Sequence, residues 1–240
     1  MSSPQGRFAA GASRIDGQLL LNATAIGKQL FLHFETAVLR IHLGIYGKWT
    51  FGDLIGDAPE PVGQVRARFL AGSRLADLRG PTACELLDEG ELADIGARLG
   101  PDPLNPDPKN IERERFAAAV KRSAQPIGLL LMNQAVIAGV GNVYRAELLF
   151  RAKLDPYRAG KTLPDEVVKG LWDDAAYLMR FGVDTGVMVT REELLGLVPD
   201  KEDRYFVYKR NGQPCRVCAN TVQLALMASR KLYWCGNCQR

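Results

Sequence analysis

Residues 215–238 read CRVCANTVQLALMASRKLYWCGNC, and they organise the C-terminal end of the chain. Two Cys-x-x-Cys pairs, Cys215 with Cys218 and Cys235 with Cys238, are separated by sixteen residues. Each pair places two thiolates on one tight turn, so four sulfur atoms can surround a single ion as in structural zinc sites. The spacing therefore predicts one structural Zn²⁺ held by these four cysteines, with a hairpin of residues 222–226 and 231–234 between the pairs.

The segment around the cysteines carries only positive charge. From Tyr205 to Arg240 there are six lysines and arginines and no acidic residue. A small, metal-stabilised basic hairpin commonly binds nucleic acid, so we expect this surface to contact DNA or RNA. The alternatives are a ribbon that only closes the fold, a solvated basic surface, and two disulfides in place of the metal. The sequence shows no secretory signal and no membrane-spanning apolar run, which disfavours disulfides, and the fifth cysteine, Cys84, is expected in a core.

The rest of the chain divides into a strand-rich part and a helical part. Its 240 residues are 47% hydrophobic with a net charge of +4, which fits one large domain or two ordinary ones. Short apolar runs separated by turn residues predict strands in the first third; they span residues 18–23, 29–33, 38–46, 49–51 and 64–70. A helix is predicted over residues 85–99. The stretch Cys84–Asp94 is acidic, whereas the C-terminal segment is basic. This uneven distribution of charge indicates that one side of the protein faces nucleic acid.

A proline-rich stretch, GPDPLNPDP at residues 100–108, separates the two parts. Because such a run cannot continue a helix, residues 100–109 are predicted to be an interdomain hinge. Beyond it, helices are expected over residues 111–122, 127–133, 143–152 and from Pro164 to Arg180, with Asn110 and Asn142 as N-caps. The predicted fold class is α+β, with an incomplete β-sandwich domain (1–99), a helical domain (110–203) and a zinc-finger hairpin (204–240).

A glycine-rich turn precedes one of these helices, within QPIGLLLMNQAVIAGVGNVYRAELLF at residues 125–150. Gly139 and Gly141 keep the turn free of side chains, so a phosphate could approach the backbone amides at the helix start. Asn142 would place a side-chain donor beside those amides. The other interpretation is an ordinary glycine-rich turn between packed helices.

Three separate segments resemble one protein family. Residues 139–150, GVGNVYRAELLF, resemble the helix–two-turn–helix signature of the formamidopyrimidine-DNA glycosylase/endonuclease VIII family. Its zinc finger is similar to YKRNGQPC (208–215) and WCGNCQR (234–240), and its N-terminal sandwich to GKQLFLHF (27–34) and HLGIYG (42–47). The resemblance covers nearly the whole chain and implies base-excision repair: removal of an oxidised base, then β-elimination at the abasic site. It also implies that damaged DNA is the partner, and that the protein is a monomer in the bacterial cytoplasm, associated with the nucleoid and with no membrane.

The resemblance assigns roles to four residues of the N-terminal part. Lys28 matches a lysine that reaches the phosphate beside the lesion and assists catalysis, and His42 matches a histidine that touches a backbone phosphate. Without the resemblance they would be a solvated lysine and a structural sheet histidine. Ile45 and Tyr46 match side chains that fill the gap left by a flipped-out nucleotide; their alternative is core packing.

The remaining implied contacts lie in the C-terminal half. Gly141 and Asn142 match the phosphate-binding turn, and Tyr208 and Arg230 match finger residues that clamp the phosphates flanking the lesion. Arg230 joins Lys28 in the implied catalytic set, since a guanidinium can hold a phosphate bidentately. The segment HLGIY at 42–46 is closer to the endonuclease VIII branch, which favours oxidised pyrimidines and abasic sites as substrates.

The start of the chain departs from the family pattern. The family's nucleophile is an N-terminal proline followed by glutamate, and its secondary amine attacks C1′ of the sugar. This chain begins MSSPQGRF, where Pro4 is internal and its nitrogen is an amide. Relatives typically carry VSSPQGRF after a helix of about two dozen residues, and a GTG codon encodes valine internally but methionine at a start. We therefore expect that the printed chain begins at an internal start and that the nucleophile lies outside it.

Two functions from different classes stay open on the sequence. One is a DNA glycosylase with lyase activity, and the other is a non-catalytic damaged-DNA-binding protein built on the same fold. An in-frame Met-Pro-Glu extension in the genomic sequence upstream of codon 1 would favour the enzyme. A ribosome-associated zinc-ribbon protein is a remoter alternative, and the residues that argue against it are Lys28, His42, Tyr46 and Arg230.

Overall fold

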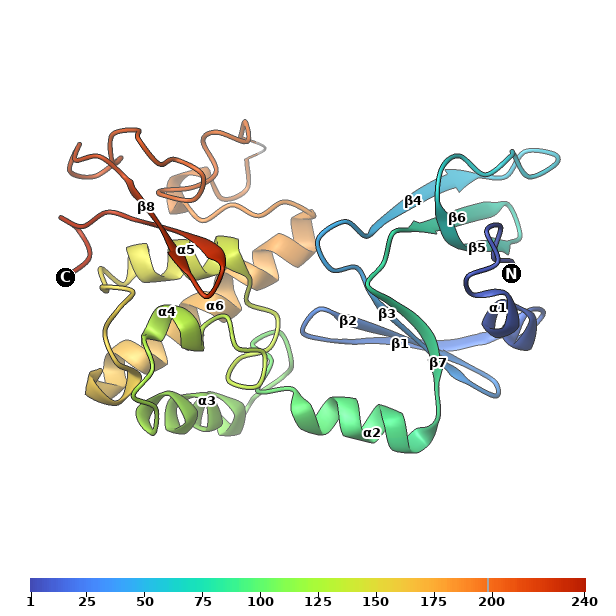
Figure 1. Cartoon of the computed structure of the whole chain (residues 1–240), viewed down its shortest axis with the longest axis horizontal. Helices are drawn as coiled ribbons and strands as arrows, with labels where there is room; N and C mark the ends of the chain where they lie inside the picture. Colours follow the sequence, from blue (N-terminus) through green and yellow to red (C-terminus); the bar gives the residue numbers. More distant parts are fainter. Residues whose placement is uncertain (198) are drawn as a thin grey trace. The chain divides into compact units, whose positions relative to one another are not determined.

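The computed structural model describes residues 1–197 and 199–240, and it divides the chain into two compact units, Met1–Arg98 and Leu99–Arg240. The predicted α+β class is confirmed: the first unit is built on two antiparallel sheets, and the second is helical with a C-terminal hairpin (Figure 1). Within the described residues, no helix is both long and apolar enough to cross a membrane.

The first unit is a sandwich of two antiparallel sheets. One sheet has the strand order β1-β2-β3-β7 and the other β4-β6-β5. Helix α1 precedes the strands and helix α2 follows them (Figure 1). In chain order the elements are α1 (Ala9–Ile15), β1 (Leu20–Ile26), β2 (Gln29–Phe34), β3 (Val38–His42), β4 (Lys48–Asp53), β5 (Val65–Ala71), β6 (Arg74–Arg79), β7 (Ala83–Leu87) and α2 (Glu89–Arg98).

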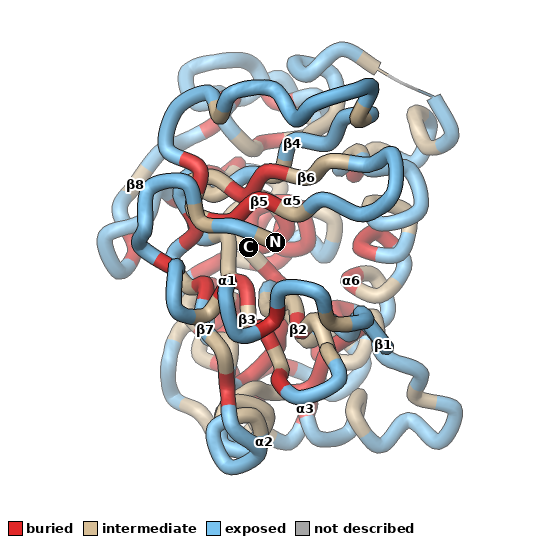
Figure 2. Tube along the Cα trace, turned by 90° about the vertical axis from the view of Figure 1, so that its right-hand side faces the viewer, coloured by how far each residue is buried: buried red, intermediate tan, exposed pale blue. Residues whose placement is uncertain are grey.

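Alternate residues of the strands build the core of this unit. In β3, Leu39 and Ile41 are buried while the residues between and beside them are only partly covered. A strand turns successive side chains to opposite faces, so these two residues reach Leu78 of β6 in the other sheet. Ile15 of α1 closes the same cluster. The connecting turns are mostly exposed (Figure 2).

The predicted helix over residues 85–99 is wrong in its first turn. Residues Ala83–Leu87 form β7, because Cys84 and Leu87 are buried and the strand pairs with β3. The helix begins only at Glu89, where a capping box starts it: the Glu91 N–H donates to Asp88 Oδ1 at 2.8 Å, and the Asp88 N–H donates to Glu91 Oε2 at 3.0 Å. Tertiary strand pairing thus overrides the local helical pattern.

Two elements of this unit are absent from the sequence-based prediction. Residues 9–15 form a helix within a part predicted to be strands, and residues 74–79 form the central strand of the second sheet. The pattern of the latter, RLADLR, contains three charges and no continuous apolar run. Its Asp77 is nevertheless buried, because Arg68 of β5 binds both carboxylate oxygens, at 2.8 and 3.0 Å.

The second unit consists of helices followed by the cysteine-bearing hairpin. Its elements are α3 (Ile111–Lys121), α4 (Ile127–Leu130), α5 (Asn142–Arg151), the 3₁₀ turn η1 (Gly160–Thr162), α6 (Asp165–Thr185), the 3₁₀ turn η2 (Glu192–Leu194), β8 (Gln223–Met227) and β9 (Arg230–Trp234). Helix α6 follows Pro164 as predicted, and it ends at Gly186, whose φ of 70° suits a left-handed helix end. One face of α6 joins the main core of this unit.

The proline-rich stretch lies on the second unit. Pro101 and Asp102 are buried, the Gly100 N–H donates to the Gln134 carbonyl at 2.8 Å, and the Ala138 N–H donates to the Pro101 carbonyl at 2.8 Å. Its motion as a hinge stays a prediction, as do the domain limits 1–99, 110–203 and 204–240.

The predicted helix starts are only partly correct. Asn110 occupies the N-cap position of α3, but its φ is 55° and its side chain makes no capping hydrogen bond. Asn142 is the first residue of α5 rather than its cap, which is Gly141. Helix α4 ends at Leu130 instead of Asn133.

Candidate zinc site and nucleic-acid interface

The four C-terminal cysteines meet at one point. Their sulfur atoms all lie within 4.8 Å of one another. Cys215 and Cys238 approach to 3.9 Å between Sγ atoms, and Cys218 and Cys235 to 3.4 Å. Zinc–sulfur bonds of about 2.3 Å in a tetrahedron require sulfur atoms about 3.8 Å apart, so the cluster fits one structural zinc ion.

The same distances exclude the disulfide alternative in this structure. A disulfide joins its sulfur atoms at about 2.0 Å, whereas all four thiols are unbonded and grouped. Two of them, Cys215 and Cys235, are buried in a small cluster that includes Phe150 of α5 and Tyr233 of β9. The metal site is therefore continuous with the packing between the finger and the helical part.

The hairpin between the two cysteine pairs places Arg230 next to a tight turn. Met227 pairs with Arg230, so the loop has two residues, Ala228 and Ser229, with φ of 49° and 60°. These left-handed values are those of a type I′ turn. Arg230 is exposed at the start of β9. The predicted strand ranges, 222–226 and 231–234, each lie within one residue of the observed ones.

The glycine-rich turn before α5 is fixed by a side chain. The Gln134 amide donates to the Val140 carbonyl at 2.9 Å and accepts from the Gly139 N–H at 3.1 Å. Gly139 has a φ of 86°, which disfavours any residue with a side chain. Gly141 then adopts an extended conformation as the N-cap of α5.

Asn142 links this turn to the finger. Its amide nitrogen donates to the Lys231 carbonyl at 2.9 Å, and its Oδ1 accepts a hydrogen bond from Arg145 Nη2. Arg145 Nη2 also donates to the Lys231 carbonyl, at 2.8 Å. The glycine-rich turn and the finger hairpin, almost ninety residues apart in sequence, thus meet at the Lys231 carbonyl. Arg230 is the residue that precedes Lys231.

Glu147 makes a second link between α5 and the finger. The Phe206, Val207 and Tyr208 N–H groups donate to its carboxylate at 2.7, 2.9 and 2.8 Å, and the Thr190 hydroxyl donates at 2.6 Å. The side chain is fully buried, which raises its pKa, while the four donated hydrogen bonds act to lower it. All four partners are donors, so the arrangement is built for a carboxylate.

Glu147→Gln is expected to destabilise the second unit by about 2 kcal/mol or more, because the new amide nitrogen would face two buried donors. Chemical denaturation followed by circular dichroism measures this loss. Glu166→Gln, a change of an exposed acid in α6, should leave stability within about 0.5 kcal/mol. Equal stability of the two variants would show that the four hydrogen bonds contribute nothing net.

Tyr208 lies in an aromatic cluster. Its ring packs edge-on against Tyr205 and Tyr233 at centroid distances of 5.4 and 5.3 Å. Lys209 Nζ stands 5.7 Å from the centroid of the same ring. Burial raises the pKa of the Tyr208 phenol. Packing against Tyr205 and Tyr233 therefore explains the position of the Tyr208 ring. A phosphate contact from its hydroxyl stays a prediction.

In the first unit, Lys28 and His42 lie at the same end of one sheet. Lys28 is exposed in the two-residue turn between β1 and β2, and its neighbour Gln29 pairs with His42 at the end of β3. Burial lowers the pKa of His42, and the positive charges of Arg40 and Lys28 lower it further. The surroundings of His42 therefore favour the neutral form of the imidazole.

Ile45 and Tyr46 stand on the loop that follows His42. They are 79% and 85% exposed, which excludes the core-packing interpretation. The loop is closed by a hydrogen bond from the Gly47 N–H to the Leu43 carbonyl, at 3.0 Å. Large apolar side chains held at a loop tip in water are suited to insertion between stacked bases.

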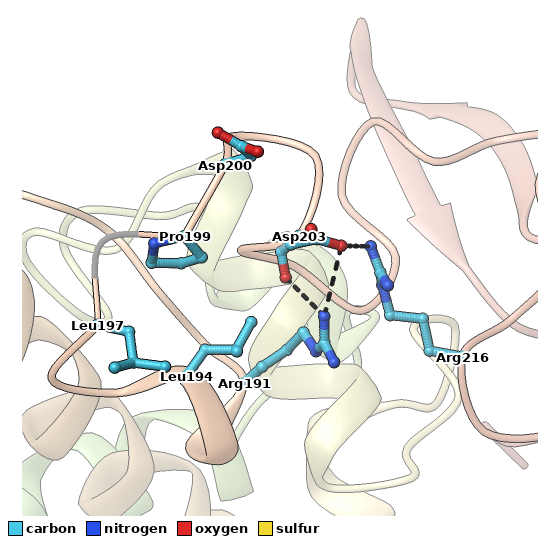
Figure 3. Close-up of a pocket in the computed structure, with 7 residues that line it drawn as sticks. All are labelled: Arg191, Leu194, Leu197, Pro199, Asp200, Asp203 and Arg216. Atoms are coloured by element: carbon cyan, nitrogen blue, oxygen red, sulfur yellow. Dashed lines mark hydrogen bonds and ion pairs between the residues drawn. The ribbon is translucent and has the colours of Figure 1, made fainter.

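A shallow hollow lies beside the finger, lined by Arg191, Leu194, Leu197, Pro199, Asp200, Asp203 and Arg216 (Figure 3). Both arginines bind Asp203: Arg216 Nη2 lies 3.0 Å from its Oδ1, and Arg191 Nη1 donates to its backbone carbonyl at 2.9 Å. Their charge is therefore balanced locally, and we assign the hollow no role.

Sequence reasoning missed Arg145 and Glu147 as functional positions. Both lie inside the quoted motif, and both are charged residues with no exposed surface. The available signal was helical spacing, because Tyr144, Glu147 and Leu148 share one buried face. Charged residues on a buried face require dedicated partners.

Two family profiles match the chain. One is described as the formamidopyrimidine-DNA glycosylase H2TH domain and matches residues 99–193. The other is described as a zinc finger found in FPG and IleRS and matches residues 212–240. The second match includes all four clustered cysteines.

Curated relatives resemble the chain over most of their length. Endonuclease 8 1 of Mycobacterium tuberculosis is 46% identical over 247 residues, which cover 100% of this chain and 91% of the relative. Formamidopyrimidine-DNA glycosylase of Thermus thermophilus is 30% identical over 234 residues, covering 93% and 84%.

Solved structures of similar fold include two Fpg proteins. The crystal structure of the Thermus thermophilus protein has 30% sequence identity and a TM-score of 0.74, covering 93% of this chain and 84% of that one. A complex of Lactococcus lactis Fpg with DNA containing an abasic site has a TM-score of 0.75, covering 93% and 83%. At 22% identity, the latter similarity concerns the fold alone.

Proposed function

Since this chain belongs to the formamidopyrimidine-DNA glycosylase/endonuclease VIII family, we propose that it releases oxidised bases from DNA and cleaves the abasic site by β-elimination. The chain carries the fold of these DNA-repair glycosylases and their four-cysteine finger. The observation that carries the proposal is the junction of Asn142, Arg145 and the Lys231 carbonyl, which joins the glycine-rich turn to the basic hairpin. Binding as a monomer, at the bacterial nucleoid in the cytoplasm, is part of the same proposal.

In this proposal the junction binds the phosphates of the damaged strand. Asn142 keeps a second amide hydrogen beyond the one donated to Lys231. The N-terminus of α5 adds a partial positive charge, and exposed Arg230 can bind a phosphate with two parallel hydrogen bonds. In the first unit, Lys28 and His42 would each contact a backbone phosphate of the DNA.

The proposed substrate is DNA from which one nucleotide has been flipped out. Extruding a nucleotide costs a few kcal/mol of stacking and pairing, least where the base is damaged or missing. Ile45 and Tyr46, held in water on their loop, would occupy the gap and offset part of that cost. Oxidised pyrimidines and abasic sites are the proposed lesions.

The chemistry requires an amine with a free lone pair. In the proposed reaction, a secondary amine supplied from outside residues 1–240 forms a bond to C1′, and the bond from C1′ to the base breaks, with the base leaving protonated. The bond from C1′ to O4′ then opens, O4′ takes up a proton, and C1′ and the amine nitrogen form an iminium ion that makes the C2′ hydrogen acidic. Loss of a C2′ proton then breaks the bond to the 3′ oxygen, and the phosphate leaves. Lys28 would assist by neutralising the phosphate beside the lesion.

Arg230→Ala is expected to weaken binding to every DNA sequence and to reduce the slope of log affinity against log salt by about one unit. Tyr46→Ala should leave this slope unchanged and reduce only the preference for abasic over intact duplex. Fluorescence anisotropy over a salt series measures both quantities. Arg115→Ala is the control, because it removes one positive charge at an exposed position of α3. Its DNA affinity and salt slope should equal those of wild type. Unchanged affinity and slope in Arg230→Ala would show that the phosphate contact is misplaced.

A further inference from the structure

Arg145 is a buried arginine near the start of α5. Its exposed fraction is 0%, and it ranks among the largest fully buried side chains of the chain. A buried charge is costly unless it is paired and fully hydrogen-bonded. A buried arginine such as Arg145 is therefore expected to have partners for all three of its guanidinium nitrogen atoms.

Among the residues that the structure describes, only one of its three guanidinium nitrogen atoms has partners. Nη2 donates to Asn142 Oδ1 and to the Lys231 carbonyl, whereas Nε and Nη1 are buried with no partner in this part of the chain. No acidic side chain among residues 1–197 and 199–240 forms an ion pair with Arg145. Arg151 in the same helix shows the usual solution, because Asp174 and Glu192 bind it at 2.7 and 2.9 Å.

The positive charge of Arg145 is also opposed by its neighbours. Burial, and after it the positive charge of Arg230, lower the pKa of its guanidinium to about 10. The side chain is still protonated at neutral pH, so the charges of Arg145 and Arg230 repel each other, and neither forms an ion pair with an acid among the described residues. An anion that binds at Arg230 would relieve this repulsion.

Arg145 also dictates the direction of the Asn142 amide. An asparagine amide can present either its oxygen or its nitrogen to a given neighbour. A guanidinium can only donate, so it holds Oδ1 inward and leaves the NH₂ group toward the Lys231 carbonyl and the surface. A phosphate arriving there meets a donor instead of an acceptor.

We propose that Arg145 is a positioning residue of the phosphate site, which orients the Asn142 amide, fixes the hairpin through the Lys231 carbonyl and adds its charge to that of Arg230. The inference rests on the proposed DNA-binding function and deepens it. The DNA phosphate is the counter-ion that the described part of the chain does not supply. A buried arginine that served only as packing would have no effect on the charge balance of DNA binding.

Two substitutions separate the charge of Arg145 from its geometry. Arg145→Gln keeps one donor and removes the charge, and Arg145→Lys keeps the charge and removes the planar guanidinium. For a duplex with a tetrahydrofuran abasic analogue, we expect Arg145→Gln to reduce the salt slope by about one unit and the affinity at least about tenfold. We expect Arg145→Lys to keep the wild-type slope and lose affinity about threefold to tenfold. Arg115→Gln, the matched exposed control, should match wild type.

The geometric part is tested in a double-mutant cycle. In an Asn142→Ala background, Arg145→Lys should lose clearly less affinity than in wild type, because there is no longer an amide to orient and only the bond to the Lys231 carbonyl is changed. The proposal would be overturned if the double variant lost affinity by the product of the two single-variant losses, or if Arg145→Gln kept the wild-type salt slope. Zinc content and thermal unfolding report folding, and if Arg145→Gln does not fold, the cycle with Arg145→Lys decides. If wild type itself binds the abasic duplex no better than an intact one, the proposed function fails, whereas normal binding by all Arg145 variants refutes only this inference.

Discussion

Removing the zinc ion is expected to abolish DNA binding by the chain. Binding free energy at a four-cysteine site is folding free energy, so the hairpin should unfold without its metal. The hairpin carries Arg230 and the Lys231 carbonyl that fixes Asn142, so its loss should disable both elements of the second unit that we propose to bind phosphate. Elemental analysis should give about one zinc per chain. Dialysis against a strong chelator, followed by anisotropy with abasic duplex, measures the loss.

Substitutions provide the controls for this result. Cys235→Ser removes a buried ligand and should reproduce the chelated state, whereas Cys84→Ser lies in β7 outside the cluster and should retain zinc and affinity. Restoring zinc should restore binding to the chelated wild type but not to Cys235→Ser. Zinc-free protein with full DNA affinity would contradict the assignment.

The 240-residue chain is expected to bind abasic DNA but to form little covalent adduct when borohydride is added. Trapping requires an amine with a free lone pair at C1′. In this structure the Met1 amine is paired with Asp16, and Ser2 is hydrogen-bonded to Arg68 of β5 at 2.8 and 2.9 Å, which keeps the terminus on a sheet. A lysine ammonium has no free lone pair at neutral pH. Fusing the Met-Pro-Glu helix of the family to the chain should restore both trapping and base release.

Gel electrophoresis of borohydride-treated complexes measures this difference directly. The fused chain with its N-terminal proline acetylated is the control, since it keeps the length and the proline nitrogen is then an amide without a free lone pair. Robust trapping by the 240-residue chain that is lost in Lys28→Ala would contradict the expectation and make Lys28 the nucleophile. Trapping by neither chain, with normal DNA binding, would favour the non-catalytic alternative.

The zinc ligands and the α+β class were accessible from the sequence because each depends on local spacing. Cys-x-x-Cys pairs fix two ligands within one turn, and alternating residues such as Leu39 and Ile41 reveal a half-buried strand. Residues 83–87 show the limit of such patterns. Their local sequence suits a helix, and only pairing with β3 makes them a strand.

The buried polar links could not be derived in the same way. Arg145 and Glu147 read as ordinary charges of an amphipathic helix, and the backbone groups of the finger that they bind lie 86 and 59–61 residues away in sequence. Contacts at such separations depend on how the finger folds back on α5, which no local pattern encodes. Exposure of Ile45 and Tyr46 is likewise a result of loop closure around Gly44 and Gly47.

The attachment of the hairpin to the helical part has a consequence for protein engineering. At Gly128 of α4, a methyl group would lie 2.9 Å from Met227 Sδ and 3.1 Å from the Pro156 carbonyl, so the hairpin packs against bare backbone there. Together with the three N–H groups that bind Glu147, this makes the finger a poor portable module. A finger grafted from a distant homologue would need its matching α4 and α5 residues, and libraries that recombine the two segments should yield stable chimaeras only when both come from one parent.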